Sequence, residues 1–157
     1  RFLMRLSLGY PDTDEERAIL RRFRATEPLD DLQPVVTADA LADLIGRVRD
    51  VYVCPALEDF IIALAQATRA SEALSLGVSP RGTLALLRTS QALAALHGRD
   101  HVLPDDVLAL VEPVWAHRVI PSGRRRLHGE AAADILRALV ATVPVPVEER
   151  WSVRAPA

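Results

Sequence analysis

The stretch ATRASEALSLGVSPRGTLALLRTSQALAALHGRDHVLPDDV, residues 67–107, decides the fold. Leu76–Ser79 reads as a loop, and Ser79 stands directly before Pro80. Serine is a favoured N-cap and proline is well placed in a first turn, so a helix is predicted to start at Pro80. This helix is apolar on almost every side and ends at Gly98, which favours a place at the centre of a helical core.

Further helices are predicted on both sides of this stretch. Capping residues, acidic first turns and apolar residues at i, i+3 and i+4 predict that they begin at Asp12 or Thr13, Thr37, Pro55, Leu103–Pro104 and about Glu130. The helix that follows Thr37 is expected to turn its apolar side chains inward, namely Leu41, Leu44, Ile45 and Val48. The segment from Pro144 onward is expected to be extended or disordered.

Composition narrows the class of protein. The chain has 157 residues, of which 50% are hydrophobic and only 4% aromatic, so the core must consist of Leu, Val, Ile and Ala and the fold should be rich in helix. The net charge of -2 does not suggest nucleic-acid binding. The single cysteine, Cys54, excludes an intramolecular disulfide. The sequence also contains no uncharged apolar run long enough to be a candidate membrane span. A cytoplasmic location is the resulting expectation.

The first eight residues, RFLMRLSL, have the alternation of a β-strand. No second strong strand lies nearby, and a lone strand is not stable. We therefore expect the run Arg1–Leu8 to belong to a sheet whose other strands lie outside this chain.

Three stretches together resemble the MoxR branch of AAA+ ATPases. They are RFLMRLSLGYPDTDEERAIL (residues 1–20), the stretch 67–107 quoted above, and HRVIPSG with the helix and VPVPVEE that follow it (residues 117–149). The resemblance covers nearly the whole chain in family order. It implies an all-α fold, the helical lid bundle of AAA+ type, with a residual N-terminal strand and helix from the α/β core. The implied boundaries are 1–30 for the end of the core, 31–143 for the lid and 144–157 for the tail.

The resemblance also implies a function. Such proteins are hexameric ATPases that use ATP and Mg²⁺ to remodel or assemble other proteins, often with a von Willebrand A-type partner. This chain contains no G-x-x-x-x-G-K-[ST] loop and no lysine that could complete one. The chain alone is therefore expected not to hydrolyse ATP, and the phosphate-binding loop would lie upstream of Arg1.

Site residues follow from the resemblance position by position. Arg81 matches the sensor-2 arginine, and Pro80 before it would hold it in a first helical turn, where a guanidinium can face phosphate oxygens. Arg1 matches a candidate arginine finger supplied to a neighbouring subunit. Arg69 matches a lid position, for which a favourable place at the helix C-terminus or loop bracing is favoured over a nucleotide or interface contact. No metal site is expected, since the four histidines lack ligand spacing.

Alternative interpretations remain open. The basic run Arg124–Arg126 could bind an acidic partner or nucleic acid, although a solvated loop is the favoured interpretation. Short helices around Pro104 also suit a helix-turn-helix or histone-like DNA-binding module, which the weak net charge disfavours. A structural helical adaptor that binds a partner helix, without nucleotide, is the other alternative.

Overall fold

Helices account for most of the regular structure in the described residues. The computed structural model describes residues 2–24, 29, 32–127 and 129–147. The elements within these residues are α1 (Thr13–Phe23), α2 (Ala38–Val48), α3 (Pro55–Ala70), β1 (Leu74–Leu76), α4 (Pro80–Leu96), α5 (Pro104–Trp115), β2 (Ile120–Pro121), α6 (Gly123–Leu127) and α7 (Ala132–Val140). The expected all-α fold class is confirmed.

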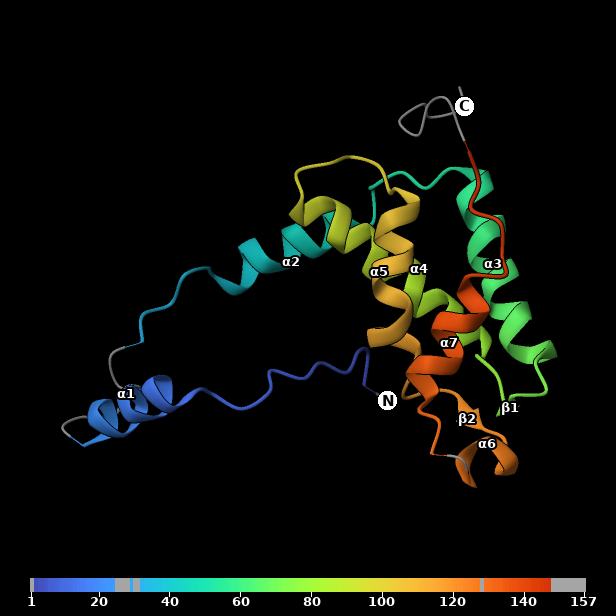
Figure 1. The fold of residues 1–157 in the computed structure, drawn as a ribbon. Helices are drawn as coiled ribbons and strands as arrows, with labels where there is room; N and C mark the ends of the chain where they lie inside the picture. The colour runs from blue at the N-terminus through green and yellow to red at the C-terminus, as the bar shows by residue number, and fades with distance from the viewer. Residues whose placement is uncertain (1, 25–28, 30–31, 128, 148–157) are drawn as a thin grey trace. The chain divides into compact units, whose positions relative to one another are not determined.

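The core lies where α3, α4, α5 and α7 pack against one another (Figure 1). Trp115 is its largest fully buried side chain, and it is surrounded by aliphatic residues from all four helices. On α4, Leu86 is completely buried, Leu87 is only partly buried and Leu84 is 44% exposed. Apolar residues do occur on nearly every side of α4, as the sequence indicated. Only one side of the helix faces the core, however, so α4 is less fully buried than expected.

Two short strands and one bridge tie the loops to this core. Strands β1 and β2 pair antiparallel. The extended piece at Tyr52 forms an isolated parallel bridge with His101, and Tyr52 accepts a backbone hydrogen bond from Val102 at 2.9 Å. Leu76 thus belongs to a strand, which shortens the predicted loop Leu76–Ser79 to three residues.

The strand predicted at the N-terminus does not form. Residues 2–10 have no strand assignment, and Arg1 lies outside the described residues. The physical reason is the one anticipated from the sequence: a strand needs a neighbour to satisfy its backbone groups, and the described part of the chain supplies no neighbouring strand here.

The chain divides into two compact units, residues 6–45 and residues 1–5 with 46–157. In the first unit, Asp12 caps α1 as expected: it accepts hydrogen bonds from the N–H groups of Asp14 and Glu15, and Glu15 returns one to the N–H of Asp12. The predicted boundaries at residues 30 and 143 stay predictions.

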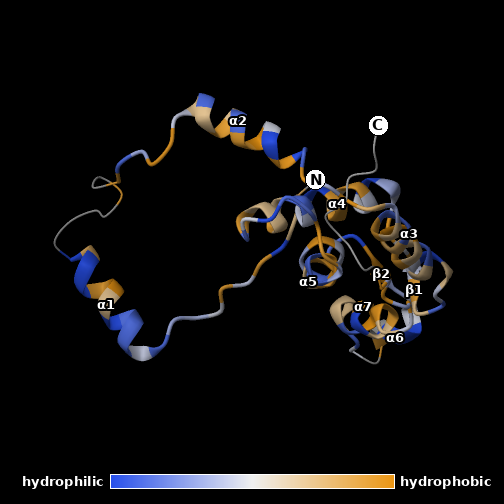
Figure 2. Cartoon of the chain, turned by 90° about the horizontal axis from the view of Figure 1, so that it is seen from above, coloured by the Kyte–Doolittle hydropathy of each residue, from blue (hydrophilic) through white to orange (hydrophobic). Residues whose placement is uncertain are grey.

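The expectation that the apolar side chains of α2 point inward is wrong in this chain. Leu41, Leu44 and Ile45 are each about half exposed, and no residue of α2 is buried. Figure 2 shows hydrophobic and hydrophilic residues mixed along α1 and α2. Amphipathic spacing identifies an apolar stripe, but burial also requires a partner surface, which periodicity does not report.

Residues 123–127, which include the basic run Arg124–Arg126 that was expected to be a solvated loop, instead form the short helix α6. Arg124 and Arg125 are exposed on it, and Arg125 forms two hydrogen bonds with the Glu130 carboxylate at 2.7 and 2.9 Å. Residues 144–147 have no regular structure, and the rest of the predicted tail lies outside the described residues. In the described ranges, no helix is long and apolar enough to span a bilayer.

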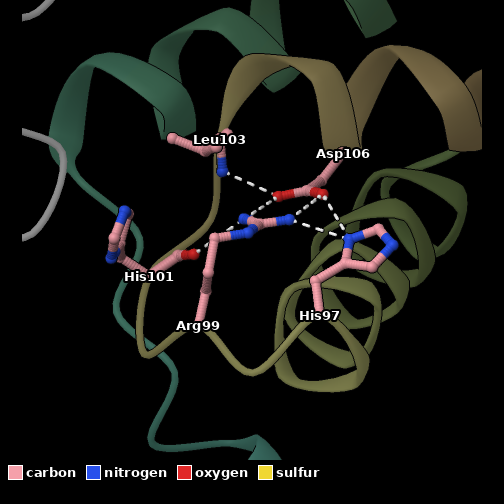
Figure 3. Close-up of polar contacts among 5 residues, drawn as sticks. All are labelled: His97, Arg99, His101, Leu103 and Asp106. Atoms are coloured by element: carbon pink, nitrogen blue, oxygen red, sulfur yellow. Dashed lines mark hydrogen bonds and ion pairs between the residues drawn. The ribbon is translucent and has the colours of Figure 1, made fainter.

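A buried ion pair closes the connection between α4 and α5 (Figure 3). Arg99 donates from Nη1 to Asp106 Oδ2 and from Nη2 to Asp106 Oδ1, each at 2.6 Å. Asp106 also accepts a hydrogen bond from the N–H of Leu103 at 2.8 Å, so its carboxylate caps the first turn of α5. His97 Nδ1 lies 3.0 Å from Arg99 Nη2.

The pKa of the Asp106 carboxyl lies below its ordinary value of 3.8. Burial pushes this pKa upward, but the hydrogen bonds from Arg99 and from the N–H of Leu103, together with the charge of Arg99, outweigh that effect. The hydrogen bond with Asp106 correspondingly raises the pKa of Arg99. The pair is therefore ionised at neutral pH, and it links the segment after α4 to the first turn of α5.

Removal of the Asp106 charge should destabilise the fold. We expect Asp106→Asn to lower the free energy of unfolding by about 2–3 kcal/mol, less than for a fully buried pair because the Arg99 side chain remains 23% exposed. The measurement is urea unfolding at pH 7, with Asp105→Asn, an exposed neighbour in the same turn, as the matched control.

This loss should also depend on pH. Because the pKa of Asp106 is lowered in the folded state, its contribution is complete above the unfolded-state value and is lost as pH falls through the folded-state pKa. The difference between wild type and Asp106→Asn should therefore narrow below about pH 4. A difference that is constant between pH 7 and pH 3 would show that the charge of Asp106 does not stabilise the fold.

Candidate functional site

The loop before α4 is held by the last turn of α3. The N–H of Val78 donates to Thr68 Oγ1 at 3.0 Å, and the carbonyl of Val78 accepts from Arg69 Nε at 2.7 Å. The Thr68 hydroxyl itself donates to the carbonyl of Ala65, which leaves its lone pairs facing Val78. Both backbone groups of one buried residue are thus fixed by two consecutive side chains of α3.

Gly77 allows this close approach. A Cβ at Gly77 would lie 2.7 Å from both the Thr68 carbonyl oxygen and Arg69 Cα, which are backbone atoms that cannot rotate away. Any side chain at position 77 would therefore push the loop off α3. The glycine is required by packing against the backbone of α3.

The start of α4 follows directly from this clamp. Ser79 is the N-cap, as predicted, and its hydroxyl oxygen accepts from the N–H of Gly82 at 3.3 Å. Pro80 occupies the first helical position, where its missing N–H costs nothing. Arg81 comes next and its side chain is exposed. A flexible guanidinium therefore projects from a backbone that is fixed on both sides.

Gly82 connects the same turn to α5. Its carbonyl accepts a hydrogen bond from the indole Nε1 of Trp115 at 2.9 Å. A Cβ at Gly82 would lie 2.7 Å from Val78 Cγ1, so the helix start and the clamped loop touch without space between them. The first turn of α4 is consequently packed between the Val78 loop and the end of α5.

An apolar groove of about 420 Å³ runs between α3 and α4. Its walls come from both helices: Glu58, Ile61, Ile62, Ala65, Arg69, Pro80, Thr83, Leu84 and Leu87. Arg69 lies at one end and extends Nη2 to 3.4 Å from Thr83 Oγ1. Two of the predicted site residues, Arg69 and Pro80, thus line one groove, and Arg81 adjoins it in sequence.

Each predicted site residue has a definite status. Arg69 makes the loop-bracing contact that its favoured interpretation required, and its Nε is engaged by Val78. Arg1 lies outside the described residues, so its role stays a prediction. Within the described ranges, no group of three or more His, Cys, Asp and Glu side chains could hold a metal ion.

The sequence did not identify the residues that position Arg81. Thr68 is absent from the predicted site residues, although a threonine near the end of a helix can form hydrogen bonds to nearby backbone groups. Gly77 and Gly82 gave no signal beyond loop and helix start. The hydrogen bond from Trp115 to Gly82 joins positions 33 residues apart, so it leaves no local signal in the sequence.

The Thr68–Val78 hydrogen bond can be tested with an isosteric change. Thr68→Val keeps the shape but leaves the buried N–H of Val78 without its acceptor, so we expect a loss of about 1–3 kcal/mol in the free energy of unfolding. The matched control is Thr89→Val, because the Thr89 hydroxyl bonds only to the carbonyls of Ala85 and Leu86 in its own helix. Equal losses in the two variants, measured by thermal and urea unfolding, would contradict the clamp.

Comparisons with known proteins match this geometry. The family described as the AAA lid domain matches residues 66–139, which run from the end of α3 through most of α7. The crystal structure of a proposed ATPase from Cytophaga hutchinsonii superposes with a TM-score of 0.84 at 25% identity, and covers 94% of this chain and 47% of that one.

Sequence relatives point the same way. The uncharacterized protein YeaC of Bacillus subtilis is 35% identical over 94% of this chain and 46% of its own length. Protein MoxR of Paracoccus denitrificans is 36% identical over 93% and 49%, and chaperone MoxR1 of Mycobacterium tuberculosis is 32% identical over 76% and 34%. The chain spans between about a third and a half of the length of these relatives.

Proposed function

Because the chain belongs to the MoxR-type AAA+ proteins and carries their lid, we propose that it senses ATP bound to a preceding core and couples hydrolysis to the remodelling or assembly of partner proteins. The observation that supports this role is the start of α4. There, Arg81 is exposed and the backbone that carries it is fixed by Thr68, Arg69 and Ser79.

The chemistry of Arg81 suits a sensor. A guanidinium donates several hydrogen bonds in a fixed plane, which matches phosphate oxygens. The first turn of α4 adds the partial positive charge of a helix N-terminus. Since the backbone at this point is already rigid, the contact with phosphate requires ordering of only one side chain, and movement of that contact is passed to the whole lid.

ATP would supply the phosphoryl group that is transferred, and bound Mg²⁺ would neutralise part of the negative charge of the phosphates. In this chain, Arg81 would bind phosphate oxygens and Pro80 would orient it. Arg69 and the apolar wall of the groove would keep water away from one side of the site. The remaining contacts to nucleotide and metal would come from the core that this proposal places before Arg1.

The assembly belongs to the same proposal. Neighbouring subunits of a homo-hexamer would share each nucleotide site, with Arg1 supplied to the next subunit as an arginine finger. A von Willebrand A-type protein is the proposed partner class. The proposal also places the protein in the cytoplasm. It includes no binding of nucleic acid, which the net charge of -2 supports.

The sensor role can be tested in the full-length ATPase. Arg81→Ala should reduce ATP turnover by on the order of tenfold to a thousandfold, since it removes a charge-assisted contact to the transferring phosphoryl group. Arg88→Ala, which removes an exposed arginine from the same helix, is the matched control and should keep turnover near wild type. Wild-type turnover and ATP affinity in Arg81→Ala would contradict the sensor role. Partner binding that does not depend on nucleotide would favour a structural adaptor instead.

The finger role of Arg1 needs a mixing experiment. A subunit with Arg1→Ala lacks only what it gives to its neighbour, and a subunit with a disabled phosphate-binding loop lacks only its own site. Mixed rings should therefore recover turnover that neither variant has alone, with on the order of 10³-fold or more at stake at each rebuilt site. A cis role of Arg1 predicts no recovery at any mixing ratio.

A further inference from the structure

Residues 2–5 lie against the C-terminal end of α5, although more than 100 residues separate them in sequence. Arg118 Nη2 donates to the carbonyls of Phe2 at 2.6 Å and Leu3 at 3.2 Å. His117 Nε2 lies 3.1 Å from the same Phe2 oxygen, and the N–H of Arg5 donates to the carbonyl of Pro113 at 2.8 Å. Four hydrogen bonds thus hold a four-residue segment.

The end of α5 is suited to this attachment. The last carbonyls of a helix have no partner within it, and a cation near them is favourable. Arg118 satisfies one such carbonyl by donating from Nε to Val114 at 2.9 Å, and Arg5 satisfies that of Pro113. Arg118 therefore uses its Nε for α5 and its Nη2 for residues 2 and 3.

Arg118 also lies close to the turn that carries Arg81. A Cβ placed on Gly82 would lie 3.5 Å from Arg118 Cδ and 3.8 Å from Trp115 Nε1, so the arginine stem lies beside the open side of Gly82 in the first turn of α4. Residues 1–5 fall in the same compact unit as residues 46–157. Hence one side chain lies between the turn of Arg81 and the segment that follows Arg1.

From these contacts we propose that Arg118 is a positioning residue, which couples the sensor turn of one subunit to the finger segment that the same subunit presents to its neighbour. The proposal rests on the proposed roles of Arg81 and Arg1. When the Arg81 contact moves the lid, residues 2 and 3 must move with Arg118, because their carbonyls are bonded to it. Nucleotide state at one site then sets finger geometry at the next.

The experiment uses the full-length ATPase with Arg118→Ala. Turnover per assembled ring should fall by on the order of tenfold to a hundredfold, as expected when a catalytic group is displaced by about 1 Å, whereas ATP affinity should stay within about twofold. Arg118→Lys should recover part of the turnover, since an ammonium can reach one of the carbonyls. Arg88→Ala is the matched control and should behave as wild type.

Mixing separates positioning from a purely structural role. In rings that combine Arg118→Ala subunits with subunits that bind ATP but cannot hydrolyse it, the second type keeps its Arg81 contact and donates a correctly held finger to the intact site of the first. Turnover should therefore recover above either variant alone. Hydrogen exchange should be faster in Arg118→Ala at the amide of Arg5, which donates to the carbonyl of Pro113, and unchanged in α3.

Three results would overturn the coupling. The first is an absence of recovery in mixed rings, and the second is unchanged turnover in Arg118→Ala. The third is a loss of turnover that is fully explained by weaker ring assembly or a lower thermal midpoint. If Arg118→Ala does not fold, the same mixing is done with Arg118→Lys. Failure of the proposed finger has a different signature, because Arg1→Ala would then keep wild-type turnover whatever the Arg118 variants do.

Discussion

Two hydrogen bonds from the end of α3 to the backbone of Val78 determine where α4 begins, and much of the site depends on that point. Thr68 and Arg69 hold the N–H and the carbonyl of one residue, so the loop has almost no freedom to shift or rotate. Gly77 makes the approach sterically possible, and Ser79 then converts the fixed loop into a helix start. Arg81 acquires a defined origin because the backbone before it is already ordered, which lowers the entropy lost when its side chain binds an anion.

The same constraint extends to α5 through contacts that are not local in sequence. Trp115 is fully buried and donates to the carbonyl of Gly82, so the end of α5 is fixed against the beginning of α4. At the opposite ends of the two helices, the Arg99–Asp106 pair closes the connection between them. Because α4 and α5 are bonded to each other at both ends, they are expected to move as a unit. A lid needs this property if a ligand contact at one end of the helices is to shift their other end.

Capping explains which parts of the fold were predictable. Asp12, Ser79, Pro80 and Gly98 act through their own backbone or the next turn, so their effects are written in the sequence around them, and each was assigned correctly. The run at residues 1–8 was expected to pair with strands outside this chain, and within the described residues it has no strand assignment. The inward face of α2 was wrong because burial requires a partner surface, and periodicity describes only the element itself.

The candidate site divides in the same way. Arg81 and Pro80 were placed at a helix start from sequence alone, and the structure puts them there. Thr68, Gly77 and Trp115 hold that start in place, but the sequence could not give them this role. Val78 lies 10 residues from Thr68, Gly82 lies 33 residues from Trp115, and Gly77 packs against backbone atoms of α3. Residues that display a functional group leave a local signal, whereas residues that support it are visible only after folding.

Rigidity of these supports decides whether a phosphate contact can have a distant effect. A ligand shifts an equilibrium between two lid positions only by the difference in its binding free energy for the two positions. One charge-assisted contact supplies a difference of a few kcal/mol at most, and a flexible connection would allow Arg81 to follow the phosphate while the lid stayed where it was. With Val78 held by α3 and Gly82 held by Trp115, the backbone at Arg81 cannot move without α3 and α5. If Arg81 binds phosphate as proposed, the free energy of that single contact would therefore be applied to the position of the whole helical bundle.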